Sequence, residues 1–373
     1  MIVENIHNGM PTNKRAAMFY KTEPFYSDIN QYTHTNNWEI VQSIRILNSR
    51  GYIVDLIDRD VSNWAPKYKY DLFLGLGVGN TGRHFARYSK LSQATKSILL
   101  AMGPQPDISN QRTLERYKMF NNRTGLNAPP MRTVSEVIED KYLDIIKEAD
   151  YIFNIGEKGT QSSNSYLDSK LPVLNFYPSI SPQVVFDNKW LQTRKRNSFL
   201  CFAGNGFIAK GVDLVLEAFL KDSTKELHIC GPQTEAIFFQ HYADKINNAP
   251  NIFYHGFIQP GGETFNKLAS HCSYVVFHSA SESCCTSIAT SMKAGLVPII
   301  NSWTGINIEG AGIHLREDGD IINTIKDKTD KATILTDSEY QKFVKNTLTR
   351  AENFSQESFI ESYSAALDHV IAS

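Results

Sequence analysis

Short apolar runs alternate with amphipathic stretches along almost the whole chain, and this alternation is the feature that most constrains the fold. The runs have the length of strands, as in Tyr52–Asp58 and Tyr274–Phe277, and they are apolar on both faces. Strands of this kind belong to parallel sheets that helices cover on both sides. Between the first two runs, Ile40, Ile44 and Leu47 recur at helical spacing. The pattern therefore predicts an α/β protein built on parallel sheets.

The alternation comes in two series, which predicts two doubly wound domains. The first series comprises residues 15–20, 52–58, 71–76, 97–102, 151–155 and 172–176. The second comprises residues 198–203, 226–230, 251–255, 274–278 and 297–301. The stretch between the series, residues 179–197, reads as a linker, and its basic cluster Arg194-Lys195-Arg196 is interpreted as a solvated hinge edge rather than a membrane or phosphate patch. From Thr336 onward the sequence is strongly helical.

Composition excludes several classes of protein. The 373 residues are 42% hydrophobic and carry 38 Lys and Arg against 39 Asp and Glu, which is typical of a globular protein and not of a dedicated nucleic-acid binder. No apolar run approaches the ~20 residues that cross a bilayer, and the first residues do not resemble a secretory signal. Five irregularly spaced cysteines predict neither disulfides nor a zinc site, so we expect a cytoplasmic protein.

A first glycine-rich motif, Gly77-Val-Gly79-Asn-Thr-Gly82, follows the third apolar run. Its spacing matches a dinucleotide-binding loop. However, it follows the third run rather than the first, and Met102 and Gly103 stand where a ribose-binding acid is expected. A strand-to-helix turn is therefore the better interpretation, and a dehydrogenase is a distant alternative.

Two further motifs follow the first and fourth runs of the second series. In the first, Gly204-Asn205-Gly206 precedes Lys210-Gly211, where small residues permit close backbone approach and the lysine could neutralise a diphosphate; the alternative is a glycine turn with a solvent-facing lysine. In the second, Glu282 precedes a helix opened by small residues, whose free N–H groups could hold an anion. A single glutamate there can also serve only as a charge complement to the helix.

A histidine and two cysteines near Glu282 could suggest catalytic roles that we do not assign to them. His278 ends a strand beside the motif, and a satisfied core histidine is the preferred interpretation. Cys284 and Cys285 could suggest a thiol nucleophile, but no histidine or aspartate partner can be identified from the sequence. We interpret them as small residues that open a helix.

Together with Leu227–Pro232 and Asn251–Phe257, these motifs resemble the C-terminal domain of glycosyltransferase family 4, the group 1 glycosyl transferases of GT-B type. The matching elements occur in family order over about residues 198–310. The resemblance implies two Rossmann-like domains facing each other across a cleft. Residues 1–190 would form the acceptor side and residues 191–353 the nucleotide-sugar donor side. A helix at about 354–373 would pack back on the first domain.

The resemblance also implies an activity. Family members transfer a sugar from a nucleotide-sugar donor to a hydroxyl with retention and usually without a metal, so we expect no metal and no cofactor. The expected acceptor is a glycan or a glycolipid in surface polysaccharide biosynthesis, with peripheral contact at the inner face of the membrane and no nucleic-acid partner. The alternative is a catalytically silent relative that binds a glycan or a partner protein.

By the same resemblance, Glu282 would orient the donor sugar and Lys210 would neutralise the leaving diphosphate. His34, the third expected catalytic residue, would face the cleft from the first domain and could touch the acceptor or the phosphates; the alternative is that it only caps a helix. The expected donor-binding residues are Gly204, Asn205, Gly206, Gly231, Pro232, Phe257, Ser281, Ser283, Cys284, Cys285, Thr286 and Thr290. The expected acceptor-side residues are Thr35 and Asn36.

Two positions depart from the family pattern. The family usually has a second glutamate that hydrogen-bonds the ribose, and Thr290 stands there; a threonine cannot offer a bidentate carboxylate. The family also usually has an arginine beside the glycine turn, and Asn205 stands there. Lys210 would then carry most of the phosphate charge, unless another basic residue substitutes.

Overall fold

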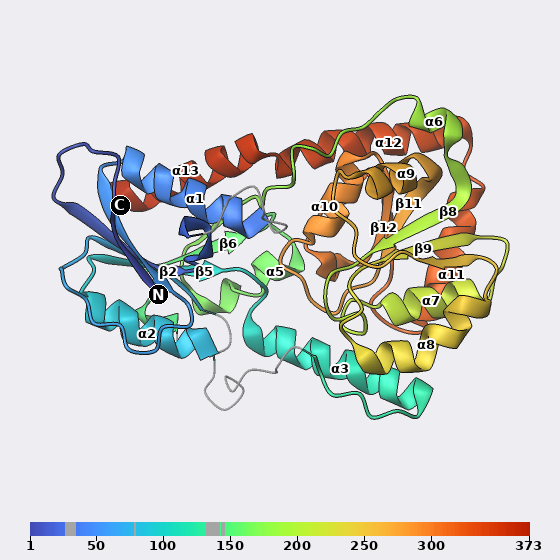
Figure 1. Ribbon diagram of the computed structural model, residues 1–373, viewed down its shortest axis with the longest axis horizontal. Helices are drawn as coiled ribbons and strands as arrows, with labels where there is room; N and C mark the ends of the chain where they lie inside the picture. The colour runs from blue at the N-terminus through green and yellow to red at the C-terminus, as the bar shows by residue number, and fades with distance from the viewer. Residues whose placement is uncertain (27–34, 78–79, 132–141, 143–145) are drawn as a thin grey trace. The chain divides into compact units, whose positions relative to one another are not determined.

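The computed structural model spans residues 1–373 and describes all of them except 27–34, 78–79, 132–141 and 143–145. The chain forms two compact units. The first contains residues 1–110, 134–179 and 356–373, and the second contains residues 111–133 and 180–355. Each unit is a layered α/β structure on a largely parallel sheet (Figure 1), which confirms the predicted fold class.

The first unit is built on a seven-stranded sheet with the order β1-β3-β2-β4-β5-β6-β7. Its strands are β1 (Ile2–Ile6), β2 (Lys14–Tyr20), β3 (Tyr52–Asp58), β4 (Leu72–Leu76), β5 (Lys96–Ala101), β6 (Tyr151–Ile155) and β7 (Val173–Phe176). β1 pairs with β3 in antiparallel orientation, and the other pairs are parallel. The chain winds outward from β2 in both directions, as a doubly wound sheet requires.

Helices cover both faces of this sheet (Figure 1). They are α1 (Thr35–Ser49), α2 (Asn80–Ser92), the start of α3 (Pro106–Thr124), α5 (Gln161–Asn164) and α13 (Gln356–Ala372). Alternate residues of β2 point to opposite faces, so Met18 joins the core under α1 and α13, whereas Phe19 joins the core under α2. This two-sided burial is why the predicted strands read as continuous apolar runs.

The second unit is built on a six-stranded parallel sheet with the order β10-β9-β8-β11-β12-β13. Its strands are β8 (Lys195–Phe202), β9 (Glu226–Cys230), β10 (Ile252–Tyr254), β11 (Cys272–Phe277), β12 (Val297–Ile300) and β13 (Ile313–His314). The chain moves from β8 to one edge and then returns to β11 on the other side. The loops after β8 and β11 therefore meet at the switch point of the sheet, where ligands bind in this kind of fold.

The helices of the second unit include one segment from the first half of the sequence. Residues 111–133, with most of α3, belong to this unit. The others are α6 (Trp190–Thr193), α7 (Val212–Leu220), α8 (Ala236–Asn248), α9 (Glu263–His271), α10 (Thr286–Lys293), α11 (Ile321–Thr333) and α12 (Asp337–Ala351). In Figure 1, α9, α10 and α12 lie on one side of the sheet and α7 and α8 on the other.

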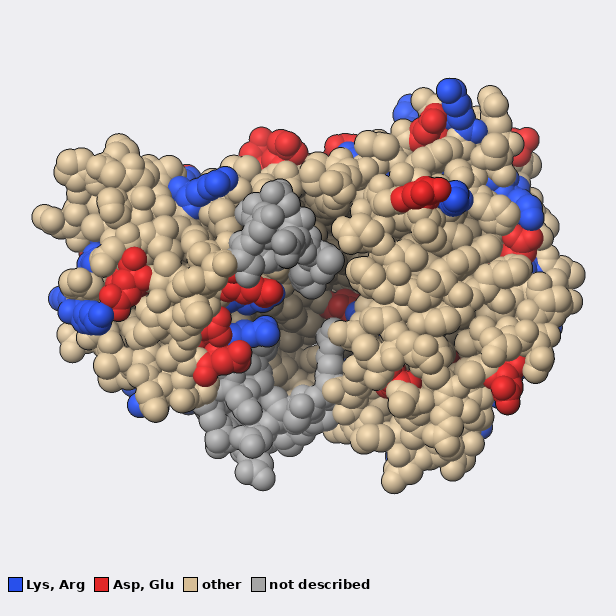
Figure 2. Space-filling view, in the orientation of Figure 1, with Lys and Arg blue, Asp and Glu red and all other residues tan. Residues whose placement is uncertain are grey.

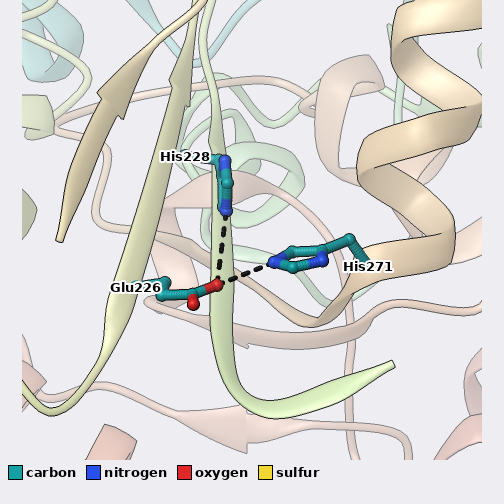
Figure 3. Close-up of side chains that lie close together, drawn as sticks. All are labelled: Glu226, His228 and His271. Atoms are coloured by element: carbon teal, nitrogen blue, oxygen red, sulfur yellow. Dashed lines mark hydrogen bonds and ion pairs between the residues drawn. The ribbon is translucent and has the colours of Figure 1, made fainter. Parts of the chain in front are cut away.

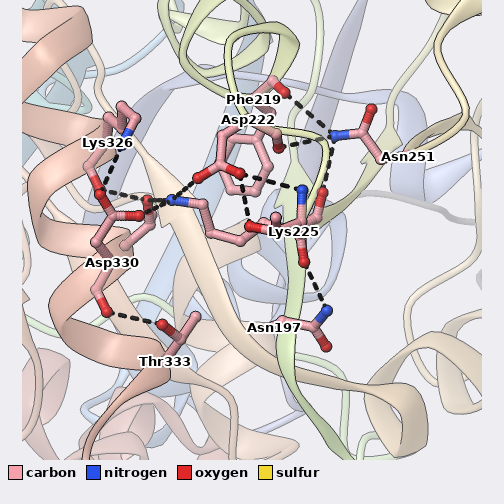
Figure 4. A network of polar contacts seen from close by, with 10 residues as sticks. Asn197, Phe219, Asp222, Lys225, Asn251, Lys326, Asp330 and Thr333 are labelled. Carbon is pink, nitrogen blue, oxygen red and sulfur yellow. Dashed lines mark hydrogen bonds and ion pairs between the residues drawn. The ribbon is translucent and has the colours of Figure 1, made fainter.

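A buried lysine ties α11 to the turn between α7 and β9 (Figure 4). The Lys225 ammonium lies 3.0 Å from a carboxylate oxygen of Asp222, donates to the Thr329 hydroxyl at 3.0 Å and pairs with Asp330. Asn251 donates its amide to three backbone carbonyls around the same turn. Because a buried charge is costly without partners, this network explains how Lys225 can be 2% exposed.

The interpretation of residues 194–196 as a solvated hinge edge is wrong for Arg194. Its side chain is buried and donates to the carbonyls of Ala294 at 2.5 Å, Gly295 at 2.6 Å and Ala269 at 2.9 Å. These carbonyls lie at the ends of α10 and α9, where the chain needs donors. Arg194 is thus a structural residue, whereas Lys195 is exposed at the start of β8.

On the described part of the face that Figure 2 shows, acidic and basic side chains lie interspersed. Among the residues that the structure describes, no helix has the length and apolar character needed to cross a membrane. All five cysteines are free.

Candidate active site

The two motifs singled out in the second half of the sequence follow the two strands at the switch point. The loop 203–211 follows β8, and the loop 278–285 follows β11, its neighbour in the sheet. The backbone N–H of Ala280 donates to the Ala209 carbonyl at 2.8 Å, which joins the two loops. Residues that lie about 70 positions apart in the sequence therefore form one site.

Glycine at position 211 makes this contact possible. Gly211 has a φ of 69°, and a Cβ atom there would lie 2.2 Å from the His278 carbonyl oxygen. Any side chain would push the two loops apart, and the positive φ also favours glycine. Below the first loop, the buried carboxylate of Glu235 accepts from the Ile208 N–H at 2.9 Å. Burial raises the pKa of Glu235, and its other oxygen accepts from the Tyr117 hydroxyl.

Lys210 and Glu282 form an ion pair across the switch point. Their side chains are only 10% and 15% exposed, so both have left bulk water and their attraction is screened less than at a surface. The Ser279 hydroxyl lies within 3.5 Å of the same Glu282 oxygen. The structure thus brings together two of the three residues for which the resemblance implied direct roles, one cation and one carboxylate.

Backbone hydrogen bonds to residues 303 and 304 hold the loop that carries Glu282. The N–H of Glu282 donates to the Trp303 carbonyl at 2.8 Å, and the N–H of Cys285 donates to the Thr304 carbonyl at 2.9 Å. Cys285 is the N-cap of α10, so the loop leads directly into the N-terminus of that helix. The first N–H groups of a helix point outward and favour negative charge.

Three arginines of α3 pack against this part of the second unit. Arg112 donates to the Ala280 carbonyl at 2.6 Å and to the Glu317 carboxylate at 3.0 Å, with its guanidinium over the Trp303 ring. Arg116 donates to the His278 carbonyl at 2.7 Å. Further along the helix, Arg123 pairs with the buried Asp213 of α7. Arg112 and Arg116, which precede the second series of strands in the sequence, therefore hold the loop after β11.

His278 is the satisfied core histidine that was preferred. One ring nitrogen, Nδ1, lies 2.9 Å from an Arg116 nitrogen, and Nε2 lies 2.9 Å from the Arg316 carbonyl. Arginine can only donate, so Nδ1 accepts and Nε2–H donates. Burial and the charge of Arg116 lower the pKa of His278 to about 4, which keeps the ring neutral. Burial likewise lowers the pKa of Arg116 to about 10, so the arginine remains charged.

The loops after β9 and β10 contact each other, and the loop after β9 also contacts the glycine turn after β8. Gly231 donates its N–H to the Gly256 carbonyl at 2.8 Å, and a Cβ atom at Gly231 would lie 2.6 Å from the Ala203 carbonyl oxygen. Phe257 follows with its side chain 58% exposed. The Asn205 side chain accepts from the Thr234 hydroxyl at 3.2 Å. Of the expected donor-binding residues Gly231, Pro232 and Phe257, Gly231 thus lies against the start of the glycine turn.

The remaining candidate residues have separate environments. Gly204 and Asn205 are exposed, Gly206 is buried, and Thr290 lies buried in α10. Burial raises the pKa of Cys285, which disfavours a thiolate nucleophile. Ser281 and Ser283 are buried, and Cys284 and Thr286 are half-buried.

Of the first-domain candidates, His34 lies outside the described residues. Thr35 and Asn36 begin α1 in the first unit and are half-buried.

A comparison with protein families gives one match: residues 186–311 fit the model of glycosyl transferases group 1. The matched segment contains the loops after β8, β9, β10 and β11 and the pair of Lys210 with Glu282. The second unit carries a group 1 glycosyltransferase domain. No curated protein matches the chain by sequence.

Solved structures extend the likeness to the whole chain. A sucrose-phosphate synthase from Thermosynechococcus elongatus aligns with a TM-score of 0.69 at 12% identity, covering 96% of this chain and 100% of its own. HepE from Anabaena, in complex with UDP and glucose, aligns with a TM-score of 0.59 at 11% identity, covering 96% and 100%. WaaG, a glycosyltransferase involved in lipopolysaccharide biosynthesis, aligns with a TM-score of 0.57 at 13% identity, covering 96% and 100%.

These likenesses give the chain the GT-B fold. At such low identities they carry the fold alone, and the group 1 match covers only the second unit. Together the group 1 domain and the GT-B fold indicate a glycosyltransferase, as the sequence predicted.

Sequence reasoning missed the α3 residues that support the group 1 domain. Arg112 and Arg116 are four residues apart and so share one face of a helix, and this spacing is the signal that could have marked them. Nothing in the sequence pairs that face with a loop more than 160 residues later, because the contact exists only in the folded chain. Glu317 was also missed. Burial opposes its ionisation, but hydrogen bonds from Ser302 and Asn301 outweigh burial and lower its pKa.

Proposed function

We propose that the protein is a retaining glycosyltransferase that moves a sugar from a nucleotide-sugar donor to a hydroxyl of a glycan or glycolipid acceptor. The observation that carries the proposal is the buried pair of Lys210 and Glu282 at the switch point. A nucleotide diphosphate needs a focused cation, and a sugar that develops positive charge in the transition state needs a carboxylate beside it. The pair supplies one of each.

In the proposed reaction, the bond between the anomeric carbon and the diphosphate oxygen breaks while the acceptor hydroxyl oxygen forms the new bond to that carbon, and the hydroxyl proton passes to the departing diphosphate. The leaving diphosphate gains negative charge, which Lys210, the backbone N–H groups of residues 204–206 and the N-terminus of α10 would stabilise. Glu282 would orient the sugar ring and stabilise its oxocarbenium character. Donor binding would exchange the Lys210–Glu282 contact for a contact of Lys210 with phosphate. We propose that this transfer uses no metal and no cofactor.

The acceptor is assigned to the first unit, with Thr35, Asn36 and His34 as candidate contacts. Support for a surface glycan or glycolipid comes from the neighbours: one is involved in lipopolysaccharide biosynthesis, and another is described with UDP and glucose. We propose the same class of process here, in the cytoplasm or at the inner face of the membrane.

The test is transfer or slow donor hydrolysis by the purified chain across UDP-, GDP-, ADP- and CMP-sugars. The wild type should release nucleotide from at least one donor. Glu282→Gln removes the charge but keeps the shape, and should lower the rate by about 10²-fold or more. The matched control is Glu309→Gln, because Glu309 is an exposed glutamate of the same unit. Retention would be read from the anomeric configuration of the product by NMR.

A catalytically silent relative is the second candidate, and two residues favour it. Asn205 stands where the family usually has an arginine; it carries no charge, and its side chain accepts a hydrogen bond from Thr234. Thr290 stands where the family usually has a second glutamate. This alternative predicts binding of a glycan or a partner protein without turnover of any donor. Turnover that disappears with Glu282→Gln but persists with Glu309→Gln would reject it.

A further inference from the structure

A second cluster of side chains, drawn in Figure 3, includes the first residue of β9 and the residue directly before β11 in the same sheet. Glu226 and His228 are two residues apart on β9 and therefore point to the same face. His271, the last residue of α9, completes the cluster. One carboxylate oxygen and two imidazole nitrogens lie within 4.8 Å of one another.

The inner histidine of this cluster has an unused nitrogen. His228 is 8% exposed, and its Nε2 has no hydrogen-bond partner among the described residues. That atom is directed at Glu226, 3.8 Å from the nearer carboxylate oxygen (Figure 3). A buried polar atom without a partner costs free energy. The arrangement therefore calls for a ligand that accepts this lone pair.

The other nitrogen of the same ring is fixed. His228 Nδ1 lies 3.0 Å from Nε2 of His255, and the His228 ring stacks on Phe253 with 4.9 Å between ring centroids. When Nδ1 carries the proton and donates to His255, Nε2 presents its lone pair to the cluster. Metal-bound histidines are held in this way, with the second nitrogen donating to a neighbour.

We propose that Glu226, His228 and His271 bind a Zn²⁺ ion. The ligands would be the near oxygen of Glu226 and the Nε2 atoms of the two histidines. This is a two-histidine, one-carboxylate set of the kind that zinc takes, with a fourth position left for water.

The observed spacings fit this ion. Zinc bonds of ~2.0–2.2 Å in a tetrahedron place ligand atoms about 3.3 Å apart. The Glu226 oxygen lies 2.7 Å from His271 Nε2 and 3.8 Å from His228 Nε2, two distances that lie on either side of this value. The second oxygen of Glu226 is 2.8 Å from the Lys195 ammonium. The ion pair of Lys195 with Glu226 can persist when zinc is bound, and the positive charge of Lys195 would lower the affinity of the site for Zn²⁺.

The location gives the ion a structural role. β9 lies inside the sheet and α9 covers one side of it, so the ion would clip the end of α9 to the strand. The cluster lies at the start of β9, whereas the Gly231 loop follows its end. The proposal therefore stands independently of glycosyl transfer.

The test is a zinc titration of the full chain, freed of any affinity tag and treated with a chelator. Competition with a chromophoric chelator at pH 7.5 should show one Zn²⁺ per chain with a micromolar or tighter dissociation constant. His271→Ala and Glu226→Gln should each weaken binding at least tenfold. Zinc should also raise the Tm of the wild type, because it binds the folded state, and should leave the Tm of His271→Ala unchanged.

The matched control is His314→Ala, which removes an exposed histidine elsewhere in the unit and should bind like the wild type. The side chain of His271 is 32% exposed, so its alanine variant should fold, as circular dichroism would check. Lys195→Met should tighten binding severalfold, because it removes a positive charge from Glu226. The proposal is overturned if the wild type binds no stoichiometric zinc, if His271→Ala binds as well as the wild type, or if Lys195→Met binds more weakly.

Discussion

Two buried histidines of the second unit, His278 after the carboxyl end of β11 and His228 in the middle of β9, differ in their environments. His278 follows the end of β11, and both of its ring nitrogens have partners, Arg116 on one side and a backbone carbonyl on the other. His228 lies in β9, and one of its nitrogens has no hydrogen-bond partner among the described residues. Burial lowers the pKa of each to about 4. Both imidazole rings are therefore neutral near pH 7, but only His228 has a ring nitrogen without a hydrogen-bond partner among the described residues.

The difference follows from the groups that surround each ring. At the carboxyl ends of the strands, Lys210, Arg112 and Arg116 bring positive charge to loops that lead into a helix N-terminus. That environment suits an anion. Toward the strand starts, two imidazoles face one carboxylate, and that environment suits a cation. One sheet therefore separates two kinds of ligand chemistry.

The largest expected effect concerns the cation of the carboxyl end. Lys210→Ala should lower transfer or donor hydrolysis by about 10²–10³-fold, because it removes the charge placed to meet the leaving diphosphate. Steady-state kinetics would measure the change. Lys345→Ala, at an exposed lysine of α12, is the control and should keep wild-type kinetics. Unchanged kinetics for Lys210→Ala would mean that the carboxyl ends of the strands do not form an anion-binding environment.

The next effect concerns the support of the loop after β11. Arg116→Met should destabilise the second unit by about 3 kcal/mol, since it leaves the His278 carbonyl and Nδ1 without their donor in a buried place. Chemical denaturation would measure it. Lys118→Met, at an exposed lysine on the same helix, should change stability by less than about 0.5 kcal/mol. Equal stability of both variants would show that α3 does not hold the loop.

A pH experiment tests the buried, neutral state of His278. His278 stays neutral in the folded state down to pH about 4, whereas in the unfolded chain it binds a proton below about pH 6.5. The unfolded state therefore binds more protons in this window, and stability falls as pH is lowered from about 6.5 to about 4. His278→Asn should reduce the pH dependence of the free energy of unfolding by the amount that corresponds to about one bound proton. Denaturation at several pH values would measure this. A slope identical to the wild type would contradict the buried neutral state.

The smallest effect concerns the position where the family has an arginine. Asn205 is exposed beside the glycine turn, so Asn205→Arg adds a cation without disturbing a core. Binding of the nucleoside diphosphate should tighten by no more than about tenfold, because an exposed charge pair contributes about 1 kcal/mol or less. Calorimetry would detect it. Weaker binding would mean that the turn does not face the phosphates.

Much of the fold could be predicted because burial on both faces leaves a visible pattern. β3, β6 and β9 begin and end where their apolar runs do. β1 was missed because it is an edge strand with exposed and half-exposed residues, and β13 because two residues make no run. The prediction for Arg194 was wrong because a run of basic residues in a sequence does not show that one of them is buried and hydrogen-bonds the carbonyls at the ends of two helices.

The candidate site could be predicted in part for the same reason. Lys210 and Glu282 could be placed because each follows a recognisable strand, and parallel strands bring such loops to one edge. The support from Arg116 and the cluster of Glu226, His228 and His271 could not, since each depends on contacts between distant segments. Local patterns identify strand ends, whereas tertiary contacts decide which side chains meet there.

The most direct test of the central claim is binding of nucleotide sugars to the purified chain. Calorimetry or thermal shift with UDP-, GDP-, ADP- and CMP-sugars should give one stabilising ligand with a one-to-one stoichiometry. That binding should weaken at least tenfold in Lys210→Ala and remain in Lys345→Ala. If no nucleotide sugar binds, or if binding is equally strong in Lys210→Ala, the switch point between β8 and β11 is not a donor site.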